Sequence, residues 1–133
     1  MSGEADLVSV TKAGYMNEFE IKCSRGDFLN EINMKKRCKR MKHNYYLTDR
    51  GPKSPGYPSR FWFVTPHAIS SSLEIPEHAG LIHIYKNDYH YYFKEIKEAP
   101  RLHENKVDMK TIEGLAQSLS VKIFKRFIEP KIK

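Results

Sequence analysis

An aspartate, a glutamate and a lysine near the start of the chain have types and spacing that could support metal-assisted hydrolysis of a phosphodiester. Asp6 begins a run rich in β-branched residues, and Glu20 and Lys22 are one residue apart in a second run with period-2 alternation. Two carboxylates with an amine beside them can hold a hard divalent cation, Mg²⁺ or Mn²⁺, and act on a water or a phosphate. The spacing therefore makes Asp6, Glu20 and Lys22 the candidate catalytic residues.

A hairpin would bring the two acidic residues together. Residues 6–11 and 15–22 are typical of two strands, and Lys12–Gly14 is typical of a three-residue loop with glycine at its end. In that register the numbers of opposed residues sum to about 26, which places Asp6 opposite Glu20. We therefore expect the two carboxylates on the same face of the hairpin.

The second strand carries further polar groups on that face. Period-2 alternation places Glu18, Glu20 and Lys22 together. We expect Asp6, Glu20 and the backbone carbonyl of Ile21 to be the metal ligands, because Mg²⁺ takes oxygen donors and keeps several waters. The alternative is that these charges form only the solvated side of an edge hairpin.

The remaining elements follow from periodicity and turn residues. Ser24 can cap a helix over residues 25–45, with Phe28 and Ile32 on its inner face. Further strands are predicted at 60–65, 80–85 and 89–93, a single helical turn within 73–78, and a last helix over 108–127, whose apolar stripe we expect to pack in the core. The order β-β-α-β-β-(β)-α predicts an α/β or α+β domain around a mixed central sheet.

Composition limits the class of protein. The 133 residues predict one domain, 1–133, and no apolar run reaches the length of a membrane span. The N-terminus lacks the basic and apolar parts of a signal peptide, so we expect a cytoplasmic protein in which Cys23 and Cys38 are free thiols. Five histidines have no metal-ligand spacing, and we expect most of them to be surface or satisfied core residues: His67, His78, His83, His90 and His103.

A dense basic block covers residues 35–43, and the net charge is +7. This charge is compatible with nucleic acid, an acidic protein or anionic lipid. The block is either a solvated helix face or a surface that contacts phosphates.

Several segments together resemble a known family. Residues 4–28 read Glu4-Ala-Asp6 … Glu20-Ile-Lys22-Cys-Ser24-Arg-Gly-Asp27-Phe28, and further similar stretches lie at 58–66, 75–82 and 99–103. These segments resemble the MmcB-like branch of the PD-(D/E)XK nuclease superfamily, whose small members are common in bacteria and their phages. The resemblance covers roughly residues 4–104.

The resemblance implies a restriction-endonuclease-like fold and Mg²⁺- or Mn²⁺-dependent cleavage of DNA in repair, recombination or phage DNA processing. On this pattern Asp6 matches the first acidic position, Glu20 and Lys22 match the E-x-K pair, and Ser24 and Asp27 match the start of the following helix. Lys42 and His43 resemble a Lys-His pair that such proteins carry later in that helix, which implies supporting phosphate contacts. The candidate nucleic-acid-binding residues are then Ser24, Arg25, Lys35, Lys36, Lys39, Arg40, Lys42 and His43.

One departure from the family pattern leaves alternatives open. The superfamily core opens with a helix and a strand, whereas five residues precede Asp6 here. Either that element is missing, or the helix over 108–127 takes its place. A nuclease of this kind could form a homodimer. One alternative to it is an inactive nucleic-acid binder, in which Tyr45, Tyr46 or Trp62 could stack on bases, although we expect each of them to pack in the core or a loop instead. The other alternative is a module that binds a protein partner.

Overall fold

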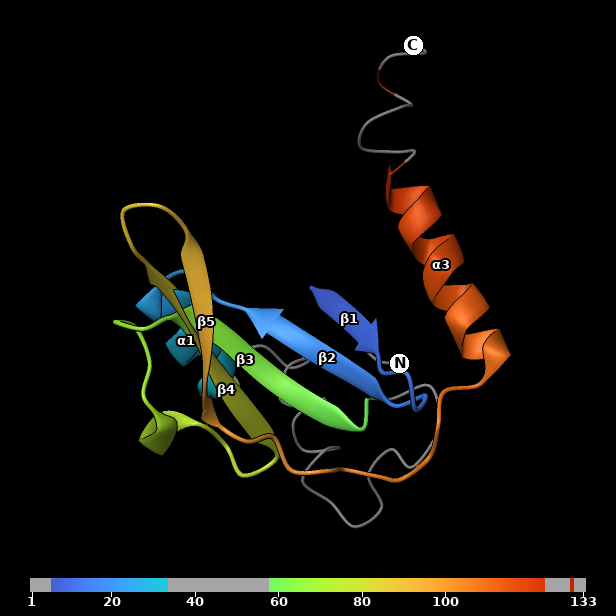
Figure 1. The fold of residues 1–133 in the computed structure, drawn as a ribbon, viewed down its shortest axis with the longest axis horizontal. Coiled ribbons are helices and arrows are strands. Elements are labelled where there is room, and N and C mark those ends of the chain that lie inside the picture. Colours follow the sequence, from blue (N-terminus) through green and yellow to red (C-terminus); the bar gives the residue numbers. More distant parts are fainter. Residues whose placement is uncertain (1–5, 34–57, 124–129, 131–133) are drawn as a thin grey trace.

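A mixed five-stranded sheet organises the chain in the computed structural model, which describes residues 6–33, 58–123 and 130 (Figure 1). The elements are β1 (Leu7–Val10), β2 (Met16–Ile21), α1 (Arg25–Ile32), β3 (Arg60–Pro66), the 3₁₀ turn η1 (Ser72–Glu74), β4 (Ala79–Lys86), β5 (Tyr91–Lys97) and α3 (Met109–Ile123). The strands lie in the order β1-β2-β3-β4-β5. The predicted element order and the α+β class are confirmed.

The first hairpin has the predicted turn and register. Gly14 has φ 95°, a left-handed conformation that suits glycine, and the amide of Thr11 donates to the carbonyl of Tyr15 at 2.9 Å. The pairs run from Leu7 opposite Phe19 to Val10 opposite Met16. Each pair sums to 26, so the register predicted from the loop is confirmed.

β2, β3 and β4 are parallel, so the chain must cross over between them, and α1 lies in the first crossover. Ser24 caps α1, because its Oγ accepts from the amide of Asp27 at 3.2 Å. Phe28 is fully buried and meets Phe63 edge-on, with ring centroids 5.7 Å apart. The core cluster comprises Phe28, Phe61, Phe63, Ile75, Ala79 and Leu81, and Leu29 and Ile32 pack against it. The predicted continuation of the helix to residue 45 lies outside the described residues.

The segment after β5 is hydrogen-bonded to the residues that precede β3 and β2. Its amides at Leu102 and Val107 donate to the carbonyls of Ser59 and Gly14 at 2.7 and 2.8 Å. Trp62 is 8% exposed, and its ring lies next to Gly80. The ring of Trp62 is therefore part of the core, which confirms the core packing expected for it over stacking on bases.

α3 does not pack as predicted. Several of its apolar side chains are exposed, with Met109 67%, Leu119 59% and Ile112 38% exposed. Figure 1 shows α3 extending away from the sheet, so it does not fill the place of a core helix. A stripe with helical spacing shows that a helix is amphipathic, but it does not say what that face contacts. Within the described ranges, neither α1 nor α3 has the length and apolarity to cross a membrane.

Candidate active site

Burial on β2 is inverted, because charged side chains face inward and an apolar side chain faces solvent. Glu18 and Glu20 are 0% and 2% exposed, while Ile21 is 41% exposed. The alternation was predicted correctly, but the charged face is the one turned inward. The interpretation of these side chains as a solvated hairpin face is therefore wrong.

The surroundings of these glutamates are apolar and covered by α1. In the parallel register Glu18 lies beside Phe61 and Glu20 beside Phe63, two fully buried rings. Burying a carboxylate there costs free energy unless it is hydrogen-bonded or paired with a cation. Each of these buried carboxylates therefore needs a hydrogen-bond donor or a cation beside it.

Lys22 supplies a positive charge at this site. Its Nζ lies 3.4 Å from Oε1 of Glu20 and 3.3 Å from Oε1 of Glu31, and its side chain is 18% exposed. The amide of Lys22 donates to the carbonyl of Val64 at 3.0 Å, which fixes the residue to β3. The predicted neighbours Glu20 and Lys22 are therefore brought together, with the amine between two buried carboxylates.

Glu31 is a site residue that the sequence reasoning missed. It lies on α1, one turn after Phe28, and is 3% exposed. Residues three apart share a helix face, so the burial of Phe28 implied that Glu31 also faces the sheet. A glutamate on the apolar side of a short helix was the available signal.

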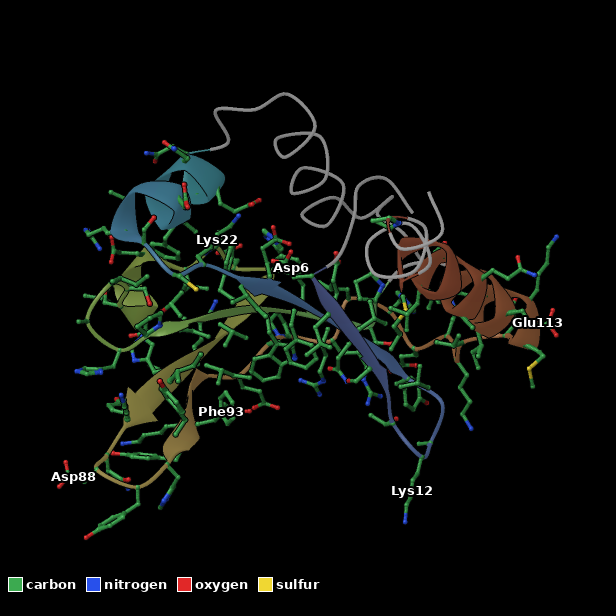
Figure 2. The ribbon with its side chains drawn as sticks, turned by 90° about the horizontal axis from the view of Figure 1, so that it is seen from above. Asp6, Lys12, Lys22, Asp88, Phe93 and Glu113 are labelled. Atoms are coloured by element: carbon green, nitrogen blue, oxygen red, sulfur yellow. The ribbon has the colours of Figure 1, made fainter. Side chains whose placement is uncertain are left out.

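Asp6 is fixed at the start of the hairpin. Its Oδ2 accepts from the amide of Ile21 at 2.9 Å. The confirmed register, continued by one pair, places Asp6 opposite Glu20, and Figure 2 shows Asp6 and Lys22 on the side of the sheet that carries α1. A carboxylate has a second oxygen and further lone pairs, so this hydrogen bond orients Asp6 without exhausting its capacity to bind a cation.

The residues predicted to be metal ligands carry oxygen donors. Asp6, Glu20 and the carbonyl of Ile21 offer oxygen atoms, the type that Mg²⁺ and Mn²⁺ prefer. Among the described residues no group of three or more His, Cys, Asp or Glu side chains is arranged to hold a metal ion. Two carboxylates and a carbonyl are a sufficient protein share for Mg²⁺, because this ion keeps several of its waters.

Arg25 and Ser24, predicted to bind nucleic acid, both make internal contacts. The guanidinium of Arg25 binds both oxygens of Glu74, at 3.2 and 2.8 Å, and the carbonyl of Ile69 at 2.8 Å. Hydrogen bonding to Glu74 raises the pKa of Arg25, and the same contact lowers the pKa of Glu74. The other candidates, Lys35, Lys36, Lys39, Arg40, Lys42 and His43, lie outside the described residues, as do Tyr45, Tyr46 and Cys38, whereas Cys23 is an exposed free thiol.

A separate buried polar cluster joins β3 and β4. Oγ of Ser70 lies 2.6 Å from Oγ1 of Thr65 and 3.0 Å from Nε2 of His83. Burial is the main cause that lowers the pKa of His83 and favours its neutral form. His83 is thus a satisfied core histidine, as expected from its lack of metal-ligand spacing.

Comparisons with known proteins address the fold. No protein-family model matches the chain, and neither does any curated protein. A solved structure described as "SPO1766 protein of unknown function from Silicibacter pomeroyi" superposes with a TM-score of 0.52 at 15% identity, over 96% of this chain and 72% of that chain. This similarity supports the α+β fold and carries no information on activity.

Proposed function

We propose that the protein is a divalent-metal-dependent nuclease that hydrolyses DNA phosphodiester bonds. The observation that carries the proposal is the inversion of β2, which buries Glu20 beside Lys22 while Ile21 is exposed. Sites at which charged side chains are buried and apolar ones are exposed are commonly functional, because packing alone would bury the apolar side chains instead. A carboxylate and an amine at this spacing, with Asp6 opposite, are the groups that such hydrolysis requires.

Each residue has a distinct role in this proposal. Asp6, Glu20 and the carbonyl of Ile21 hold the cation, which when bound polarises a phosphate oxygen and makes water more acidic. Lys22 donates hydrogen bonds to the phosphate or to the attacking water. Glu31 acts through its contact with Lys22, so it is a positioning residue that keeps the amine beside Glu20.

The overall charge supports a polyanionic partner. A net charge of +7 favours association with DNA through release of counterions. The chemistry suits repair, recombination or phage DNA processing in a cytoplasmic compartment. This part of the proposal rests on the resemblance to PD-(D/E)XK nucleases and on the charge.

A cleavage assay tests the proposal. Single- and double-stranded DNA and RNA are incubated with Mg²⁺, Mn²⁺ or EDTA, and we expect metal-dependent cutting of DNA. Glu20→Gln and Lys22→Met should abolish most of it, while Glu104→Gln, a neutralised exposed glutamate, should leave it unchanged. Cutting by Glu20→Gln at the parental rate would overturn the assignment.

The assay also separates a nuclease from an inactive binder on the same fold. A binder would retain DNA without cutting it, and its affinity would fall steeply as salt is added. That result, with correctly folded protein and either metal present, would replace the nuclease assignment by a binding function.

A further inference from the structure

No strand of the described part of the chain covers the outer edge of β5. It is the last strand of the sheet, so among the described residues β4 is its only strand neighbour (Figure 1). Its aromatic side chains are open, with Tyr91 63%, Tyr92 45% and Phe93 68% exposed. Long aromatic edges are usually shielded by charges, bulges or another chain, because they are templates for strand pairing.

The backbone of β5 has donors and acceptors aimed outward at known positions. The amide of Asn87 donates to the carbonyl of His90 at 3.0 Å, which makes these two a hydrogen-bonded pair at the end of the β4–β5 ladder. Hydrogen-bonded and non-hydrogen-bonded pairs alternate along an antiparallel ladder. The continuous register to Ile82 opposite Glu95 therefore turns the amides and carbonyls of Tyr91, Phe93 and Glu95 away from β4.

The geometry points to a second copy of this chain as the partner, paired antiparallel through β5 with Phe93 on the two-fold axis. This register places Phe93 opposite Phe93 and Tyr91 opposite Glu95 of the second copy. All three outward-facing residues then form hydrogen-bonded pairs, and the two sheets become one. The inference is independent of the proposed nuclease activity.

The side chains of β5 are self-complementary in this register. Tyr91 can donate its hydroxyl to Glu95, Tyr92 faces the ammonium group of Lys94, and the two Phe93 rings meet. If the two-fold axis lay one residue further along β5, Lys94 would oppose Lys94 of the second copy. If it lay two residues further along, Glu95 would oppose Glu95. If the axis lay one residue nearer the start of β5, Glu95 would oppose the hairpin turn of the second copy, where no strand can pair with it.

The edge side chains are also held in place before any partner arrives. The ring of Tyr92 stacks on Tyr85 at 5.2 Å and 11°, and Tyr85 in turn stacks on His67 at 4.7 Å. Nζ of Lys86 lies 5.5 Å from the ring centroid of Tyr91. Aromatic side chains ordered in advance lose less entropy on association, which favours pairing.

Disulfide trapping in the full-length protein tests the register. Cys23 and Cys38 are replaced by serine, and a cysteine is introduced as Phe93→Cys or, as the matched control, Tyr91→Cys. Hydrogen-bonded partners have Cα atoms ~5.5 Å apart, within the range of a disulfide, whereas the two Tyr91 positions would be separated by four strand steps, roughly 13 Å. We expect Phe93→Cys to form a covalent dimer on mild oxidation and Tyr91→Cys to remain monomeric.

The solution mass of the unmodified chain gives a second readout. Sedimentation velocity over a concentration series should show a reversible dimer, and Phe93→Lys should shift it to monomer while the fluorescence of Trp62 keeps its native spectrum. A parent that is monomeric throughout, equal cross-linking at both cysteine positions, or a Phe93→Lys protein that dimerises like the parent would overturn the inference. A monomeric parent whose Phe93→Lys variant loses DNA binding would also overturn the inference, because β5 would then contact nucleic acid.

Discussion

Replacing Lys22 by methionine should strongly destabilise the protein, because this ammonium lies between two buried carboxylates. Glu20 and Glu31 have side chains 3% and 2% exposed, at 3.4 and 3.3 Å from Nζ. Removing one member of a buried ion pair costs about 3–5 kcal/mol, since the remaining charge loses its compensation. Lys22 is 18% exposed and retains some solvent screening, so the expected loss is at the lower end, about 3 kcal/mol.

Urea unfolding measures this loss. The chain has a single tryptophan, and Trp62 is buried in the core, so its fluorescence reports global unfolding. Lys12→Met is the matched control, because Lys12 is exposed at the tip of the hairpin (Figure 2) and should change stability by less than about 0.5 kcal/mol. The m-values should stay constant across the set.

A double-mutant cycle refines the test. Glu31→Gln removes one of the carboxylates that Lys22 contacts, so adding it to Lys22→Met should recover part of the lost stability. A Lys22→Met protein as stable as Lys12→Met, or strictly additive effects of Lys22→Met and Glu31→Gln, would refute the view that the ammonium compensates these carboxylates.

Three further changes probe other parts of the fold. Gly80→Ala places a Cβ 2.5 Å from Cε3 of Trp62 and should cost about 1–3 kcal/mol or more in urea unfolding. Lys97→Met removes an ammonium that donates to two carbonyls at 2.8 and 2.7 Å, and should cost about 1–3 kcal/mol in the same assay. Burial lowers the pKa of His83, so the unfolded state binds more protons as pH falls below about 6.5, and the melting temperature should drop more for the parent than for His83→Gln between neutral and acidic pH.

Each of these has a contradicting result. An alanine tolerated at Gly80 without loss of stability would show that the ring of Trp62 and the backbone of Ala99 do not lie as close to Gly80 as described. Unchanged unfolding of the Lys97 variant would mean that water replaces the ammonium without cost. Parallel pH profiles for the parent and His83→Gln would show that this histidine does not titrate differently on folding.

The hairpin and the spacing of the site were accessible from the sequence because they depend on local rules. A loop ending at Gly14 fixes the register, and the register fixes which residue opposes Glu20. The cap of α1 at Ser24 is equally local. These features need no knowledge of the rest of the chain.

The tertiary placement of the faces was not accessible in the same way. Apolar periodicity in β2 favours Phe19 and Ile21 as the inward side, yet Glu18 and Glu20 are buried because α1 covers their face. The stripe on α3 showed the same limitation, since amphipathicity does not identify a contact. Glu31 was missed because its role depends on Lys22, which comes from another element.

Binding of Mn²⁺ to the full-length protein, measured by calorimetry or electron paramagnetic resonance, tests the central claim most directly. The account predicts that the parent binds the ion and that Glu20→Gln and Asp6→Asn each weaken binding by more than about tenfold, since even residues that only support metal ligands have effects of that size. Glu104→Gln should bind like the parent. Equal Mn²⁺ affinity in the parent and Glu20→Gln would contradict the assignment of these carboxylates as a metal centre.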